Sequence, residues 1–139
     1  MKQIHLESGT QEYTLNDSCV IRFNPTDLFF VEQLYNAMDA LGQMDEKRAE
    51  IAGSDSDTRS KFDAWRALDA QARQIINDLF GVDVCSACWG NVSPMAFSGG
   101  FPLWANLLCA LIDEIDETVK AEHAASMPRV NKYLKKYHR

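Results

Sequence analysis

The sequence predicts a mainly helical α+β fold, in which a three-helix bundle core is joined to a small N-terminal antiparallel β-hairpin or meander and to a basic C-terminal tail. Three observations predict this fold. Residues 2–23 contain short alternating apolar and polar segments separated by turn-forming residues. Two later segments repeat apolar residues at helical spacing. A third long segment follows Gly99-Gly100 and opens with an almost unbroken apolar run.

The chain of 139 residues is expected to form one domain, because this length suits a single hydrophobic core. Within it we expect residues 1–23 to supply the β region, residues 24–127 the helical core and residues 128–139 the basic tail. Hydrophobic residues make up 46% of the chain and charged residues 24%, which is typical of a globular protein and excludes a disordered or fibrous one.

Asn24-Pro25-Thr26-Asp27 predicts the start of the first helix. Asn24 is expected as the N-cap, Pro25 at the first helical position and Asp27 in the third, where exposed backbone N–H groups favour negative charge. The helix is expected to run to about Ile51. Its apolar stripe consists of Val31, Leu34, Met38 and Leu41, flanked by Phe30 and Tyr35.

A second helix is predicted from about Thr58 to Gly81, after a polar connector at residues 53–57. Its stripe consists of Trp65, Leu68, Ala72, Ile75 and Leu79. Because each stripe spans only about two heptads, the two helices are expected to form an antiparallel hairpin inside one bundle rather than a long coiled coil.

Residues 82–100 are expected to be irregular, apart from a short helix at about residues 83–89. Gly99-Gly100 predicts a tight turn into the final long helix, which begins near Pro102. The buried face of that helix is predicted to contain Trp104, Leu107, Leu108, Leu111, Ile112 and Ile115. Beyond Pro128 the pattern is only weakly amphipathic.

The charge is divided unevenly along the chain. The formal net charge is −6, but residues 128–139 carry +5 and no acidic residue, which leaves −11 for the rest. An acidic protein is poorly suited to nonspecific binding of nucleic acid or of an anionic membrane, so neither is expected as a partner. Opposed charges favour docking of the tail on an acidic neighbouring surface, and therefore a homo-oligomer.

The N-terminal residues contain no apolar run of the secretory type, and the longest apolar run, residues 101–112, is too short to cross a bilayer. We therefore expect a cytoplasmic protein whose cysteines are reduced. The four cysteines are Cys19, Cys85, Cys88 and Cys109.

Cys85-x-x-Cys88 is the one sharp chemical motif, and its spacing could serve a dithiol or half of a zinc site. No second pair of ligands follows, so we interpret both as packing residues, with thiol redox or zinc chemistry as the alternative. The acidic residues 113–117 lack the Glu-x-x-His pair of a bundle metal site and are interpreted as a solvated face.

No acyl-transfer, phosphate-binding or dinucleotide-binding motif is present. We therefore expect no catalytic, metal or cofactor-binding residue, and a protein that is not an enzyme. The tryptophans and phenylalanines are expected mostly in the core, with an aromatic side chain in a loop as an alternative partner anchor.

The sequence resembles small proteins of the tail-morphogenesis modules of prophages and phages of Gram-positive bacteria, encoded near the tape-measure protein. The residues that carry this resemblance are Asn24-Pro25-Thr26-Asp27, Leu79-Phe80-Gly81, Leu103-Trp104-Ala105-Asn106-Leu107-Leu108, Asp113-Glu114-Ile115-Asp116 and Asn131-Lys132-Tyr133. The resemblance implies a tail assembly chaperone in the host cytoplasm, which binds the tape-measure helix and keeps it soluble until tail-tube protein polymerises around it.

A structural tail or head-tail component is the alternative within this setting. If the protein acts by binding, the acidic and basic parts of the final segment are the expected partner-binding surfaces. The candidate residues are Asp113, Asp116, Glu117, Arg129, Lys132, Tyr133, Lys135, Lys136 and Tyr137.

Overall fold

The computed structural model describes residues 1–137, without the side chains of residues 127, 133 and 137. It confirms a mainly helical α+β fold with a two-stranded antiparallel hairpin near the N-terminus. In chain order the elements are β1 (Gln11–Leu15), β2 (Cys19–Phe23), α1 (Leu28–Ala52), α2 (Thr58–Phe80), α3 (Val84–Trp89), β3 (Phe97–Ser98), β4 (Phe101–Pro102) and α4 (Leu103–Tyr137).

The N-terminal β region is a hairpin rather than a three-stranded meander, because residues 1–10 contribute no strand. Strands β1 and β2 pair in a register that places Tyr13 opposite Ile21. Asn16 and Asp17 form the turn between them, both with positive φ angles (52° and 57°) that Asn and Asp tolerate better than most residues. The turn is closed by a hydrogen bond of 3.0 Å from the Ser18 N–H to the Leu15 carbonyl.

The start of α1 differs from the predicted one. The N-cap is Asp27, whose carboxylate accepts the Phe29 N–H at 3.0 Å. Asn24 instead folds back locally, where its side-chain oxygen accepts the Thr26 N–H at 2.8 Å and its amide donates to the Ser8 carbonyl at 2.8 Å. Asn side chains make such local turns readily, so residues 24–27 form a turn ahead of the helix rather than its first turn.

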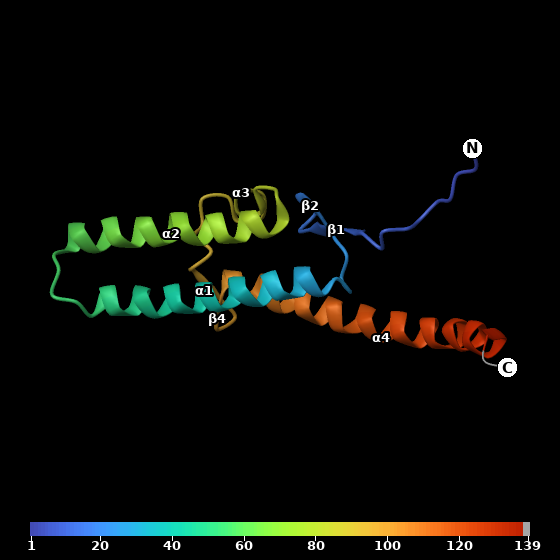
Figure 1. Ribbon diagram of the computed structural model, residues 1–139. Helices are drawn as coiled ribbons and strands as arrows, with labels where there is room; N and C mark the ends of the chain where they lie inside the picture. Colours follow the sequence, from blue (N-terminus) through green and yellow to red (C-terminus); the bar gives the residue numbers. More distant parts are fainter. Residues whose placement is uncertain (138–139) are drawn as a thin grey trace.

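The helical hairpin forms as predicted. Helices α1 and α2 lie side by side and antiparallel, joined by the connector at residues 53–57 (Figure 1). Asp57 caps α2 by accepting the Ser60 N–H at 2.7 Å. Gly81 ends α2 with a φ of 72°, a left-handed conformation that costs glycine nothing.

A single hydrophobic core joins all three long helices and the N-terminal hairpin. Leu34 and Leu41 of α1, Ala72 and Ile76 of α2, and Leu108 of α4 all have 0% exposure. The predicted three-helix core is therefore confirmed. A stack of aromatic rings ties the hairpin to the helices, in the order Tyr13, Phe23, Phe30 and Phe80, with ring centroids 4.5–6.3 Å apart.

The segment between α3 and α4 contains the small antiparallel hairpin of β3 and β4. Gly99 and Gly100 turn this hairpin with φ angles of 65° and 86°, which confirms the predicted tight turn. Pro102 pairs with Phe97 as the last residue of β4, and α4 starts at the next residue.

Helix α4 extends past residue 127, where the expected helical core meets the basic tail. It runs through Pro128 to Tyr137, so the basic tail continues the same helix. Figure 1 shows the first half of α4 against α1 and the second half projecting away from the rest of the molecule. We call residues 119–137 the arm. No helix in the described chain has the length and apolar character needed to cross a membrane.

Candidate protein-binding surfaces

An open groove lies between the C-terminal part of α1, the N-terminal half of α2 and the loop after α3. Its volume is about 420 Å³. Apolar side chains from two of these segments face it, among them Phe62, Trp65 and Leu68 of α2 and Met95 of the loop. Charged side chains, including Arg48, Arg66 and Asp69, also line it. We call this feature the aromatic groove.

The aromatic wall of the groove is fixed by contacts within the chain. The Trp65 indole N–H donates to the Arg48 carbonyl at 3.2 Å, which holds α2 against α1. Phe62 meets Trp65 edge-on, with ring centroids 5.6 Å apart, yet remains 50% exposed. The Arg48 guanidinium lies over the Phe97 ring, 5.2 Å from its centroid. The groove thus presents a large apolar ring to solvent on a fixed support.

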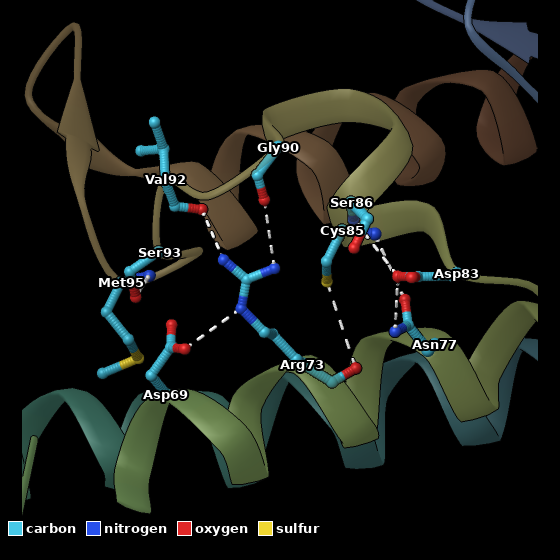
Figure 2. Close-up of polar contacts among 10 residues, drawn as sticks. All are labelled: Asp69, Arg73, Asn77, Asp83, Cys85, Ser86, Gly90, Val92, Ser93 and Met95. Atoms are coloured by element: carbon cyan, nitrogen blue, oxygen red, sulfur yellow. Dashed lines mark hydrogen bonds and ion pairs between the residues drawn. The ribbon is translucent and has the colours of Figure 1, made fainter. Parts of the chain in front are cut away.

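Arg73 fixes the loop that forms the other wall (Figure 2). From α2 its guanidinium donates to the Asp69 carboxylate at 3.0 Å, to the Gly90 carbonyl at 3.3 Å and to the Val92 carbonyl at 2.9 Å. Two hydrogen bonds from one planar cation, which Asp69 holds in place, orient the chain after α3 more firmly than a single contact. The loop is therefore a defined wall of the groove.

A second polar contact set holds α3 on α2 (Figure 2). The Asn77 side chain accepts the Cys85 N–H at 3.2 Å and donates to the Asp83 carboxylate at 3.0 Å. Asp83 also accepts the Ser86 N–H at 3.1 Å, as the N-cap of α3. The hydrogen bond from the Ser86 N–H is the main reason that the pKa of Asp83 lies below the ordinary aspartate value, and the hydrogen bond from the Asn77 side chain lowers this pKa further.

One carboxylate oxygen beside the groove is buried without a hydrogen-bond partner among the described residues. Asp69 Oδ2 accepts from Arg73, whereas Asp69 Oδ1 is buried and has no hydrogen-bond partner among the described residues. An unpaired buried acceptor costs free energy, but this oxygen has almost no accessible surface and is closed to a molecule in the groove. The groove therefore combines an apolar wall with the charged side chains of Arg48 and Arg66.

The two motif cysteines lie in α3 as unpaired thiols. Cys85 has 0% exposure, and burial raises its pKa to about 11. Cys88 is half-buried, and burial raises its pKa as well. Both environments disfavour the thiolate, which is the reactive and metal-binding form. Across residues 1–137, no group of three or more His, Cys, Asp or Glu residues is placed to hold a metal ion.

The structure places the candidate residues of the final segment on a single helix, in two groups. Asp113, Asp116 and Glu117 are exposed where α4 still packs on the body. The basic residues are exposed farther along, on the arm; they are Arg129, Lys132, Lys135 and Lys136. The side chains of Tyr133 and Tyr137 and all of residues 138–139 lie outside the described part of the chain.

The chain was compared with protein-family models, curated proteins and solved structures, and none of them matches it. The fold and the two surfaces are therefore interpreted from their own geometry.

The aromatic groove is the feature that sequence reasoning missed. It is built from three segments, at residue 48, residues 62–69 and residues 91–96, and no local pattern shows that they meet. A partial signal was present in the aromatic residues outside the predicted stripes. Phe62, Phe97 and Phe101 were expected mostly in the core, but their exposures are 50%, 53% and 60%.

Proposed function

We propose that this protein is a non-enzymatic tail assembly chaperone that binds a helical segment of a tape-measure protein in its aromatic groove. The observation that carries the binding role is the open groove of about 420 Å³ with the half-exposed Phe62 on its wall. The assignment to tail assembly and to the tape-measure partner rests on the sequence resemblance described above.

The chemistry of the groove suits one face of an amphipathic helix. Such helices bind by placing a few apolar side chains, three or four residues apart, into an apolar groove. Exposed aromatic side chains are frequent energetic anchors of protein interfaces. A tape-measure segment of this pattern would lose its exposed apolar face on binding and stay soluble.

Co-expression with the tape-measure protein of the same module tests the proposal. The native chain should co-purify with it and increase its soluble fraction. Phe62→Glu places a charge on the groove wall and should reduce the co-purified tape-measure protein by about tenfold or more, because a central aromatic anchor contributes roughly 2 kcal/mol.

Phe29→Glu is the matched control. Phe29 is also an exposed phenylalanine, at 77% exposure, but it lies in the first turn of α1 and does not line the groove. Phe29→Glu should therefore leave the amount of co-purified tape-measure protein unchanged. Equal loss with both variants, or no co-purification of the native chain, would refute the proposal. Recovery of the chain from finished tails would indicate a structural tail component instead.

A further inference from the structure

The arm of α4 offers a second surface, which the groove does not explain. Every described side chain at residues 119–136 is exposed. Helices in proteins owe most of their stability to packing, and an isolated helix of this length is marginal in water. Pro128 lies inside the arm and removes one helical hydrogen bond. The arm therefore lacks the packing that a helix normally needs.

An apolar stripe continues from the buried half of α4 along the arm. At about 100° per residue, Val119 and Val130 lie within about 20° of each other around the helix and Leu134 lies close beside them, while the polar His123 and Ser126 lie on the same line between them. Their line leads back to the buried Ile115. Val119, Val130 and Leu134 remain 45%, 45% and 49% exposed. The stripe is thus an extension of the core face that nothing in the described chain covers.

The charges beside this stripe change sign along the helix. Residues 113–122 contain five acidic residues and one lysine, whereas residues 123–137 contain four basic residues and no acidic one. By the same angular count, the acidic Glu114 and Glu122 lie on one flank of the stripe. The same flank, farther along, contains the basic residues Arg129, Lys132 and Lys136.

The charge pattern of the arm is complementary to that of a second copy that runs in the opposite direction. In an antiparallel helix pair related by a two-fold axis, each flank of one helix faces the same flank of the other, read in the opposite direction. An axis near residue 125 brings Val119 opposite Val130 of a second copy. It also brings the acidic residues 113–122 of each copy opposite the basic residues 129–136 of the other. A parallel pair would instead place like charges together, which is unfavourable.

We propose that two copies of this chain associate through antiparallel pairing of their arms about a two-fold axis near residue 125. The apolar stripe of one copy then packs against the same stripe of the second copy. Because the contact is isologous, it closes at two chains and does not grow into a filament. At the level where the tip of the partner arm would end, Asp113 and Glu117 are exposed on the other flank of the helix, whereas Ile115, in line with the stripe, is buried.

Two charge-reversal variants test the pairing. We call residues 132–136 the tip and residues 113–122 the root. The first variant combines Lys132→Glu, Lys135→Glu and Lys136→Glu, which makes the tip acidic like the root. We measure the molar mass by light scattering at about 100 µM and low salt, where screening is weak. The native chain should have twice the mass of the 15.7 kDa chain, and the variant should be monomeric.

The second variant, Asp113→Lys with Glu117→Lys and Glu122→Lys, makes the root basic like the tip and should also be monomeric. An equimolar mixture of the two variants restores opposite charges at both ends, so it should recover the mass of two chains. A native monomer, dimeric single variants or a mixture that stays monomeric would each overturn the proposal. A mass above two chains would indicate head-to-tail assembly and would also overturn it.

Cysteine cross-linking tests the direction of the pair. In a Cys109→Ser background, chains with Val119→Cys and chains with Val130→Cys should each fail to cross-link alone and should cross-link when mixed. In an antiparallel pair, residues 119 of the two chains are about 16 Å apart along the axis, whereas a disulfide needs Cα atoms within about 7 Å. Cross-linking of either variant alone would show a parallel pair instead. None of these substitutions touches the aromatic groove, so the outcome is independent of the tape-measure experiment.

Discussion

The two halves of α4 belong to one continuous helix but have opposite environments. Before Val119, the helix contributes Trp104, Leu108 and Ile115 to the core, at 8%, 0% and 5% exposure. From Val119 onward, every described side chain is exposed. Both halves are helical, and apart from the backbone hydrogen bond that Pro128 removes from the arm, the difference lies in packing. The comparison separates what stabilises the fold from what is available for binding.

The comparison also shows why the same stripe has two roles. Apolar residues at helical spacing run through both halves, and the body covers only the first part. Burying a leucine or valine side chain contributes about 1.5–3 kcal/mol. The first half has already gained this free energy within the chain. The second half can gain it only from another molecule.

The largest expected effect separates the halves by their contribution to stability. Leu108→Ala, at 0% exposure, removes buried methyl groups next to α1 and should lower the free energy of unfolding by about 3 kcal/mol. Leu134→Ala, in the arm, should change it by less than about 0.5 kcal/mol. Urea unfolding of both variants, in the chain whose tip is acidic, measures this without a contribution from pairing.

If Leu134→Ala lowered the free energy of unfolding as much as Leu108→Ala, the arm would have to fold onto the body in solution. The proposed accessibility of the arm would then be wrong, even if the dimer were found.

The sequence predicted the packed half of the molecule well. The limits of α2 follow from Gly81 and from the polar connector, and the apolar face of α4 from Trp104 to Ile115 is buried as expected. These features depend on local spacing and capping. Asn24 was assigned as the N-cap because its type and its neighbours fit that role, but its side chain makes a local turn and Asp27 caps the helix. Two residues of similar capping ability only three positions apart cannot be told apart by pattern.

The sequence was less informative about the surfaces. We expected a helical core over residues 24–127 and a basic tail after it, and the weak pattern beyond Pro128 did not show that α4 continues through the tail to Tyr137. The aromatic groove depends on Arg73, which reaches from α2 to the carbonyls of Gly90 and Val92. A contact between a side chain and a distant backbone leaves no periodic signal. The charged candidates of the final segment were correctly expected to be exposed, and their binding role stays a prediction.

A smaller effect on stability is expected from Cys85, in the body. Its thiol has a raised pKa of about 11, so the folded state favours the protonated form. The associated stability is fully present below about pH 8.5, the ordinary thiol pKa, and is lost as the pH rises toward 11. Between pH 7 and pH 10 the free energy of unfolding of the native chain should fall by about 1–2 kcal/mol more than that of Cys85→Ala, measured by urea unfolding.

Cys109→Ala is the control, because Cys109 is exposed and its replacement should leave the pH dependence of the native chain unchanged. The same chains test the redox alternative. A catalytic dithiol needs an accessible thiolate, so rapid alkylation of Cys85 at pH 7 in the folded protein would contradict its assignment as a packing residue.

The smallest effect on the body is expected from Pro128→Ala, which nevertheless sharpens the comparison most. Proline in a helix interior is about 3 kcal/mol less favourable than alanine. In a packed helix this difference would appear in the global unfolding transition, but in an arm with exposed side chains it changes only the local helix population. In the chain with the acidic tip, Pro128→Ala should increase the helical circular dichroism signal and move the melting temperature by less than about 1 °C, since a global gain of 1 kcal/mol would move it by several degrees. A shift of several degrees would show that residues 119–137 fold cooperatively with the body, and the two halves of α4 would then form one energetic unit.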